Sequence, residues 1–181
     1  MKKLFSVLMI SVAGITASSM SFAATSEAKA NFKATEERAE ADYKVAKAKC
    51  DALKDNAKDI CVEEAKVVRT RAKAEALVNY ENTPKNHVKA AKDVADAEYA
   101  LAEEKCDDKS GNDKDVCKKE AKAAQKIAIA DAKAGKKIFD AKVDAVVTAN
   151  DANYKVAVEK CDAMSGAAKD QCVAAAKKQY K

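Results

Sequence analysis

Apolar residues recur along this chain at the spacing of an α-helix that buries one narrow stripe. The first stripe steps by 4, 3, 4 and 3 residues through Ala39, Tyr43, Ala46, Cys50 and Leu53. After a short polar interval, a second stripe runs through Cys61, Ala65, Val68, Ala72 and Ala76. Lysine and glutamate fill most positions between. This near-seven-residue period predicts two amphipathic helices that pack against each other.

Short polar sequences separate the two helices of each such unit. In the first unit the weakest helical stretch is Lys54-Asp55-Asn56, and the corresponding positions later in the chain are Lys109-Ser110-Gly111-Asn112 and Ser165-Gly166. Glycine, asparagine, aspartate and serine are the residues that favour tight turns. Each unit is therefore predicted to be a helical hairpin, that is, a helix, a tight turn and a second helix.

The hairpin unit occurs three times. Each copy has a tyrosine seven residues before a first cysteine, an aspartate directly after that cysteine, and a Lys-Asp pair shortly before a second cysteine. The tyrosines are Tyr43, Tyr99 and Tyr154, and the cysteine pairs are Cys50 with Cys61, Cys106 with Cys117, and Cys161 with Cys172. The first cysteines lie 56 and 55 residues apart, and ten residues separate the members of every pair. The three repeats cover about 27–82, 84–135 and 136–181.

The cysteine spacing tests the hairpin interpretation. Along one continuous helix, two residues eleven positions apart are separated by about 16 Å. A disulfide needs its two α-carbons within about 7 Å, so only a chain folded at the intervening turn can pair them. Closing such a loop contributes roughly 3 kcal/mol in the chain-entropy model. Six cysteines allow fifteen connectivities, and periodicity and turn placement favour pairing within each repeat.

Residues 1–23 have the pattern of a secretory signal peptide. Lys2 and Lys3 form a charged start, residues 4–15 an apolar core, and Ser21-Phe22-Ala23 a small-x-small cleavage site. The mature chain is then 24–181, and its charge is +3, because 32 basic residues remain against 29 acidic ones. No second apolar run approaches the roughly 20 residues of a transmembrane helix. We therefore expect an exported, periplasmic protein without a transmembrane anchor; extracellular release is the alternative.

Composition narrows the function classes further. A nucleic-acid-binding protein would show clustered charge of one sign, which this nearly balanced chain lacks. An even number of cysteines in an exported chain indicates a disulfide framework. The spacing fits neither a redox C-x-x-C motif nor a zinc site, so we expect no metal and no cofactor. The chain has few large apolar residues, so its core should be thin and its disulfides should compensate.

The two connections between hairpins differ in sequence. Pro84 ends the helix that arrives from the first hairpin and can start the next one. The second connection has no proline, and three options stay open: a break at Gly135, a break in the polar stretch 148–151, or one long bent helix. We favour Gly135 as the weak point, which gives an all-α protein of six helices, arranged as three stapled hairpins in a bundle or an elongated stack. The richest apolar cluster is a natural place for the hairpins to pack: Ile127, Ile129, Ile138, Phe139, Val143, Val146 and Val147.

The repeated polar residues are expected to serve the fold. Two sets of aspartates recur, Asp51, Asp107 and Asp162 after the first cysteines and Asp59, Asp115 and Asp170 before the second. The first set should bond the turn backbone, and the second set should cap the following helix. The repeat tyrosines should pack on the opposite helix of their own hairpin, with their hydroxyls at the solvent edge. His87 is the only histidine and serines are few, so we expect no catalytic residue and no enzyme.

The Ala-, Lys-, Glu- and Asp-rich composition of the predicted helices resembles that of two known families. Runs such as Arg71-Ala72-Lys73-Ala74-Glu75-Ala76 and 130–134 resemble the helical spacer of TolA-type envelope proteins and the Ala/Lys-rich repeats of late-embryogenesis-abundant proteins. The chain departs from the first in lacking a membrane anchor and a terminal globular domain, and from the second in its regular cysteines. The three-pair cysteine frame resembles that of small exported bacterial proteins. The resemblance implies a helical envelope protein and supplies no activity.

Repetition without catalytic groups leads to a hypothesis about function. We expect a non-enzymatic periplasmic helical repeat protein with a structural, spacer or protein-interaction role in the cell envelope. The alternative is a stress-protective or chaperone-like protein, and a third class is a thiol-redox or metal-buffering protein, which requires free thiols. The partner is an unknown envelope protein or client. Homo-oligomerisation stays open, since an Ala- and Val-lined stripe can also pair between chains.

Overall fold

The computed structural model describes residues 20–181, with side chains from Ser26 onward, and these residues form five α-helices and no strand. The helices are α1 (Met20–Cys50), α2 (Asp55–Tyr80), α3 (Pro84–Asp107), α4 (Gly111–Cys161) and α5 (Gly166–Tyr180). The predicted all-α class is therefore confirmed. Most of the predicted signal peptide, residues 1–19, lies outside the described residues, and residues 20–23 belong to the start of α1.

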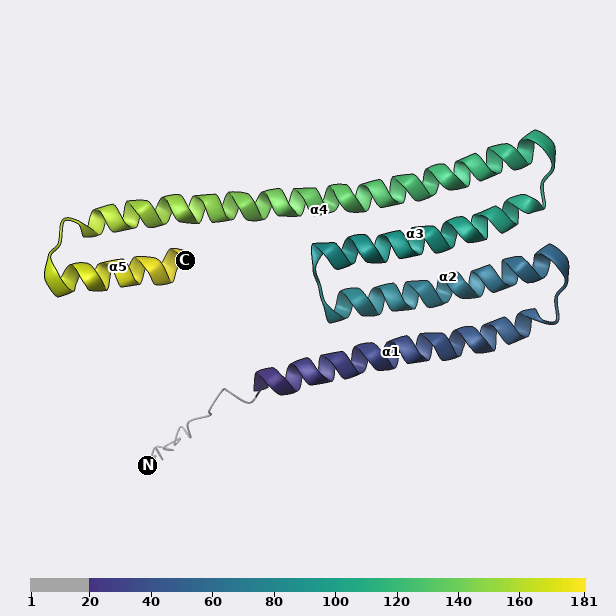
Figure 1. Cartoon of the computed structure of the whole chain (residues 1–181), viewed down its shortest axis with the longest axis horizontal. Helices are drawn as coiled ribbons and strands as arrows, with labels where there is room; N and C mark the ends of the chain where they lie inside the picture. Colours follow the sequence, from purple (N-terminus) through teal and green to yellow (C-terminus); the bar gives the residue numbers. More distant parts are fainter. Residues whose placement is uncertain (1–19) are drawn as a thin grey trace, which may run out of the picture.

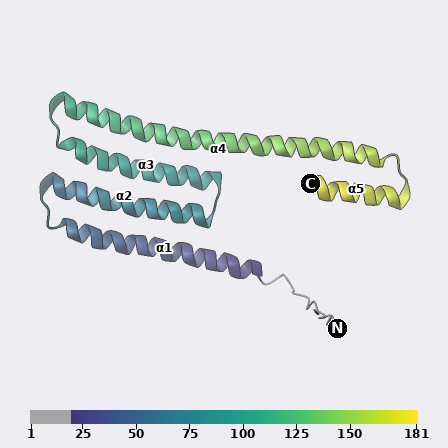
Figure 2. The same ribbon diagram turned by 180° about the vertical axis from the view of Figure 1, so that it is seen from behind.

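The five helices form a single layer. Within residues 20–181, each helix contacts only the helices that precede and follow it in the chain. Figures 1 and 2 show the consequence from both sides: α1, α2, α3 and the first half of α4 lie side by side, while α5 lies along the far end of α4. Of the two predicted forms, a bundle and an elongated stack, the molecule therefore adopts the elongated stack. Both faces of the layer are open.

The buried residues are small. The apolar residues buried among the described side chains are alanines, first cysteines and one valine: Ala39, Cys50, Ala65, Val67, Ala76, Ala90, Ala95, Cys106, Cys161 and Ala176. Small side chains let neighbouring helices approach closely but remove little apolar area from water. The three first cysteines are the largest side chains that are fully buried. The first cysteine of each disulfide is therefore the most deeply buried side chain of its hairpin, although the turn residues beside it are exposed.

The three turns share one backbone feature. The fifth residue after each first cysteine has a left-handed conformation, with φ of 50° at Asp55, 54° at Gly111 and 57° at Gly166. No heavy atom lies within 4 Å of a β-carbon built on either glycine, so a larger side chain would not clash there. Glycine is favoured at these two positions because of the backbone conformation alone. Glycine adopts it without the cost that a β-carbon imposes. Aspartate is among the few other residues that visit it, which explains why the first turn works without glycine.

The connection between α2 and α3 is a sharp turn, as the sequence predicts. Thr83 is the N-cap of α3, and its hydroxyl accepts a hydrogen bond from the backbone N–H of Asn86 at 3.2 Å. Pro84 occupies the first helical position, where its missing N–H costs nothing. The buried side chain of Asn86 donates to the carbonyl and the carboxylate of Glu81, each at 3.0 Å. Three residues therefore suffice to reverse the chain.

The expected break at Gly135 is absent, so the described chain has five helices rather than six. Helix α4 continues through Gly135 and through 148–151 for 51 residues, a length of about 76 Å. A single glycine costs a helix only about 1 kcal/mol relative to alanine. Extending an existing helix needs no new nucleation, so that cost does not stop it. The first two turns therefore lie at one end of the layer and the third lies at the far end (Figure 1).

Two packing expectations were wrong. The large apolar residues of the α4 cluster do not bring hairpins together, since Ile127, Ile138 and Phe139 are all at least half exposed. In the second stripe, Val67 is buried and Val68 is exposed. The cause is that α2 lies between two helices and buries two faces, whereas the predicted stripe describes only the one toward α1. Among the described helices, none is both long enough and apolar enough to span a membrane.

Candidate functional site

The repeated corners, each a disulfide with the turn it closes, are the most elaborate local structures of the molecule. The disulfides join Cys50 with Cys61, Cys106 with Cys117, and Cys161 with Cys172, with α-carbon separations of 5.7, 5.6 and 5.7 Å. The predicted pairing within each repeat is confirmed. Each bond lies between the last turn of one helix and the first two turns of the next, so it fixes how the two helices emerge from the turn.

An ion pair spans every corner beside its disulfide. The aspartate after the first cysteine contacts the lysine three residues before the second cysteine in all three repeats. The pairs are Asp51 with Lys58 at 2.9 Å, Asp107 with Lys114 at 3.1 Å, and Asp162 with Lys169 at 3.0 Å. This pair explains two of the repeated residues, whereas the aspartates were expected to bond the turn backbone. The seven-residue separation, with a turn between, is the signal that could have revealed it.

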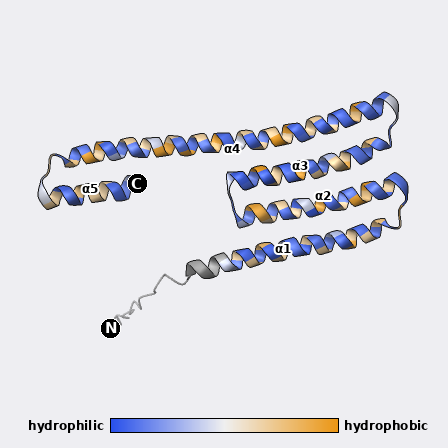
Figure 3. Cartoon of the chain, in the orientation of Figure 1, coloured by the Kyte–Doolittle hydropathy of each residue, from blue (hydrophilic) through white to orange (hydrophobic). Residues whose placement is uncertain are grey.

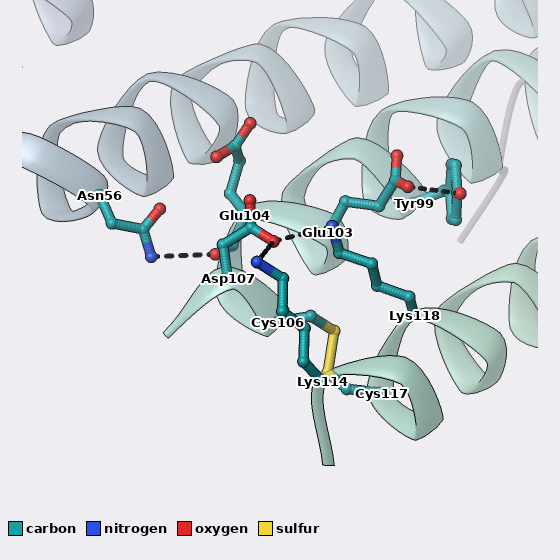
Figure 4. Close-up of a disulfide and its surroundings, with 9 residues drawn as sticks. All are labelled: Asn56, Tyr99, Glu103, Glu104, Cys106, Asp107, Lys114, Cys117 and Lys118. Atoms are coloured by element: carbon teal, nitrogen blue, oxygen red, sulfur yellow. Dashed lines mark hydrogen bonds and ion pairs between the residues drawn. A yellow bond between two sulfur atoms is a disulfide. The ribbon is translucent and has the colours of Figure 1, made fainter. Parts of the chain in front are cut away.

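The second corner has an additional cation. Asp107 also binds Lys118 at 2.8 Å, and Figure 4 shows both lysines reaching the same carboxylate beside the disulfide. Hydrogen bonds from Lys118 first and Lys114 second hold the pKa of Asp107 below its usual value. A hydrogen bond from Lys58 likewise lowers the pKa of Asp51 in the first corner. The positions that correspond to Lys118 in the other repeats are valines, so this cation belongs to the second corner alone.

The second set of aspartates does not cap the helices. The N-cap residues of the second helices are Lys54, Ser110 and Ser165, and none makes a side-chain capping hydrogen bond. Asp59 and its counterparts lie at the fifth helical residue instead, because the left-handed residue starts each helix earlier than expected. Their negative charge still lies near the helix N-terminus, where it interacts favourably with the helix dipole.

Each repeat tyrosine has a cation from the opposite helix over its ring. Arg69 lies 4.1 Å from the ring centre of Tyr43, Lys122 lies 4.3 Å from that of Tyr99, and Lys181 lies 5.4 Å from that of Tyr154. All three rings are half-buried. Contacts of this type contribute about 0.5–1 kcal/mol at exposed sites. The tyrosines therefore face the opposite helix of their own hairpin, with a cation as the partner in each case.

The hydroxyl of Tyr99 has a partner on its own helix. It donates to the Glu103 carboxylate at 2.6 Å, and this hydrogen bond is the main cause that raises the pKa of Tyr99 (Figure 4). Glu103 of α3 thus orients the ring of Tyr99 from its own helix, while Lys122 of α4 lies over the ring. The unit of ring, carboxylate and cation fixes the two helices of the second hairpin relative to each other two turns away from its disulfide.

The first two corners are tied to each other. The side chain of Asn56, at the start of α2, donates to the backbone carbonyl of Glu104 at 3.0 Å (Figure 4). It also donates to the carboxylate of Asp108 at 2.6 Å. Lys105 of α3 also binds Glu64 of α2 at 2.9 Å. The first and second hairpins therefore act as one block at this end of the layer. The third corner lies at the other end of α4 and takes no part in this network.

Ion pairs and hydrogen bonds connect neighbouring helices along their contact lines, here called seams. Glu40 of α1 binds Lys73 at 2.9 Å and Arg69 at 3.3 Å, both from α2, and the hydrogen bond from Lys73 is the main cause that lowers the Glu40 pKa. Across the last seam of the block, Gln125 of α4 donates to Asp96 of α3 at 2.6 Å. Surface pairs of this kind each stabilise little, but they fix register between helices whose contacts are mainly alanine.

Open grooves run along the seams. An apolar one follows the α1–α2 seam with a volume of about 460 Å³ and is lined by Tyr43, Val68 and the first disulfide. A more polar one, of about 590 Å³, crosses from α1 to α3 and is lined by Phe32, Lys73 and Asp93 among others. Both are surface grooves on a layer with open faces. They suit contact with another helix or an extended chain better than enclosure of a small molecule.

The chain has no free thiol among its six cysteines, since all of them are in disulfides. The thiol-based class of function therefore has no thiol to use while the disulfides are intact. Within the described residues, no three His, Cys, Asp or Glu side chains cluster as metal ligands. His87 lies at the α2–α3 turn with its Nε2 2.7 Å from the Asn82 side-chain oxygen.

Comparison of the chain with protein-family models, with curated proteins and with solved structures found no match. The roles assigned to the repeated residues therefore depend on the geometry described above and not on any relative. The structure brings the cysteines and the first set of aspartates of each repeat into one corner, and it places the repeat tyrosine two helical turns away on the same hairpin. It adds the lysine partners and the cations over the rings, which the sequence analysis did not identify.

Proposed function

We propose that this protein is a non-enzymatic structural and interaction module of the cell envelope that holds protein-binding surfaces at a fixed distance. One observation carries the proposal: an unbroken α4 joins the block of the first two hairpins to a separate third hairpin. A helix of this length spans about 76 Å. Repeat arrays of stacked helices usually act through such extended surfaces, because each element contacts only its neighbours.

The periplasm is part of the same proposal. Three disulfides with no free cysteine favour an oxidising, exported location, because cytosolic thiols are kept reduced. The predicted signal peptide supports export, and cleavage after Ala23 would make Ala24 the first residue. Intact-mass measurement on protein released by osmotic shock checks both points at once. A cytosolic chain that retains residues 1–23 and reduced cysteines would contradict this part.

The interaction role is tested by photo-crosslinking in cells. A photoreactive amino acid replaces Ile138, which is exposed on α4, or Val67, which is buried between helices. We expect adducts with one or a few envelope proteins from Ile138 and none from Val67. The proposal fails if reactive groups on the exposed faces of all five helices give no adduct with another protein.

A chaperone-like role is the second candidate, and a specific row of side chains favours it. Ile127, Ile138 and Val156 are each more than half exposed. They are separated by 11 and 18 residues, close to three and five whole turns, so they share one face of α4. An exposed apolar row can hold unfolded clients. Suppression of client aggregation at near-equal amounts, lost in Ile138→Lys, would favour this candidate.

A further inference from the structure

One stretch of α4 has no helix beside it. Every residue from 141 to 150 is exposed. On one side of this stretch, α3 begins at Pro84, which lines a cavity together with Phe139. On the other side, α5 ends where Lys181 pairs with Asp151. Figure 1 shows α4 passing alone between the ends of α3 and α5. We call residues 139–150 the uncovered stretch.

The uncovered stretch continues the face with which α4 contacts its neighbours. Gln125, which binds α3, is followed by Phe139 and Val146 at distances of 14 and 21 residues, which are whole heptads. From the other end, Val147 lies seven residues before Tyr154, whose ring faces Lys181 at the end of α5. A seven-residue spacing keeps side chains on nearly the same face of a helix. The seam face of α4 is therefore continuous, and only its partner helix is interrupted.

The side chains on this face are larger where the chain leaves them uncovered. Where α3 lies alongside, Ala128 and Ala132 are the small apolar α4 residues that line the seam cavities, and Phe139 lines the last of these cavities at the start of α3. In the uncovered stretch the apolar residues are Phe139, Val143, Val146 and Val147, with 50, 43, 59 and 53% of their surface exposed. Figure 3 shows hydrophobic colour on α4 in this interval too. A group of large apolar side chains left in water is typical of a protein-binding surface.

We infer that the uncovered stretch binds the uncovered stretch of a second copy, with the two α4 helices crossing in the antiparallel sense. The dimensions fit this occupant. The ten exposed residues, 141–150, span about 15 Å. A helix 10–12 Å across that crosses at about 50° occupies about 13–16 Å of its partner. A second copy of α4 offers a helix that is free of neighbours over the same length, so neither α3 nor α5 blocks the crossing.

The charges of α4 are self-complementary in the antiparallel sense. Residues 133–140 carry three lysines against one aspartate, whereas residues 141–151 carry one lysine against two aspartates, of which Asp151 already pairs with Lys181 at the end of α5. Antiparallel crossing places the positive half of each helix toward the less positive half of the other, whereas parallel crossing opposes the two positive halves. The register that sets Val143 against Val146 of the second copy also keeps Lys137 of one helix away from Lys137 of the other. Charge therefore selects the orientation, and the apolar residues supply the contact.

The contact is small, so the dimer should be weak. Four apolar side chains from each copy make an interface below the roughly 1,200 Å² of stable specific complexes. We expect reversible association with a Kd on the order of tens of micromolar. This inference depends on the fold and not on the proposed envelope role, so either can fail while the other stands.

Sedimentation velocity of the oxidised mature protein tests the inference, over concentrations from about 1 to about 500 μM. We expect the mass to rise from one copy to two across this range. Val146→Glu places a charge in the contact and should weaken association at least tenfold. Val156→Glu is the matched control, because Val156 is similarly exposed on the same helix but lies on another face, and it should leave association unchanged. Circular dichroism should show the same helix content in both variants.

Three other outcomes would overturn the inference. The protein could stay a monomer at every concentration, and the uncovered stretch would then be free for a helix of another protein. Val146→Glu and Val156→Glu could weaken association equally, which would place the contact elsewhere. Higher oligomers that grow without limit would indicate an interface that does not close by two-fold symmetry.

Discussion

The chain connects successive hairpins twice, and the two connections behave in opposite ways. Between the first and second hairpins, the chain reverses within residues 81–83 and the helices pack side by side. Between the second and third hairpins, the chain runs on as helix through 136–151 with no change of direction. The three hairpins have corners of the same structure, so the difference between the connections determines the shape of the molecule.

The physical difference between the connections is the presence of a stop signal. Pro84 prevents α2 and α3 from being one helix, and the Thr83 cap together with the buried Asn86 side chain stabilises the reversal. The second connection offers only Gly135, which weakens a helix without ending it. A repeat can therefore be packed against its neighbour or held away from it by a change of a few residues.

The largest expected effect comes from placing a stop signal in the second connection. Ala145→Pro should break α4 within the exposed stretch, at a local cost of about 3 kcal/mol. The third hairpin would then lose its fixed position relative to the first two. Fluorescent labels at 113 and 160 are about 70 Å apart along the intact helix. Single-molecule energy transfer should shift from one narrow low-efficiency population to a broad distribution of higher efficiency.

Ala145→Gln is the matched control, since glutamine is a good helix former and the position is exposed. It should preserve the narrow population. If the unsubstituted chain already shows a broad distribution, then α4 is not a rigid connection and the comparison between the two connections fails. Small-angle scattering gives a second check at low concentration. A rod as long as α4 alone has a radius of gyration of about 22 Å, against about 15 Å for a compact chain of this length.

The second effect concerns the third disulfide. Helix α5 has 15 residues and contacts only α4, so it is near the limit below which an isolated helix is marginal. Replacing both Cys161 and Cys172 with alanine removes roughly 2–4 kcal/mol. Hydrogen exchange of residues 166–180 should then accelerate about 30-fold or more.

The first disulfide provides the comparison. Helix α2 is longer and packs between α1 and α3, so the double replacement of Cys50 and Cys61 should leave most of α2 protected. Equal acceleration of exchange in α2 and α5 would show that position in the layer does not matter. Unchanged exchange in α5 would show that its packing on α4 suffices without the bond.

The repeated corners could be predicted from the sequence because local constraints determine them. Eleven-residue cysteine spacing, a turn sequence and helical periods leave few arrangements that satisfy the geometry of a disulfide. The ion pair between Asp51 and Lys58 was within reach of the same reasoning, because the corner that unites the cysteines also brings the flanking charges together. The cation over each ring was not, since Arg69, Lys122 and Lys181 occupy different offsets from their cysteines.

The arrangement of the hairpins could not be predicted, because weak effects decide it. Whether α4 continues through Gly135 depends on a free-energy difference of about 1 kcal/mol. The pattern of apolar residues does not indicate the sign of that difference. The cluster around Phe139 has the composition of a core, and only the absence of a neighbouring helix leaves it exposed. Burial of Val67 in place of Val68 likewise depends on which helices flank α2, a tertiary fact that a single stripe does not contain.

A third, smaller effect separates the two kinds of glycine. Gly111 needs a left-handed conformation in its turn, whereas Gly135 lies inside a helix. Gly111→Ala should lower the free energy of unfolding by about 1 kcal/mol, and Gly135→Ala should raise the local stability of α4 by a similar amount. Asp55→Gly should stabilise the first hairpin for the same reason as Gly111 stabilises the second. Urea unfolding and hydrogen exchange measure these changes, and a matching sign for the two alanine variants would contradict the distinction.

The smallest effect concerns the ion pair of the first corner at acid pH. The hydrogen bond from Lys58 lowers the pKa of Asp51 in the folded state, so the pair stabilises the fold above the unfolded-state pKa of about 3.9. That contribution is lost as the pH falls through the lower folded-state pKa, because the unfolded chain takes up the proton first. Asp51→Asn should therefore lower the Tm slightly at neutral pH, and the difference from the unsubstituted chain should shrink as the pH falls through the folded-state pKa of Asp51. A Tm difference for Asp51→Asn that stays constant as the pH falls would mean that packing rather than charge holds the corner.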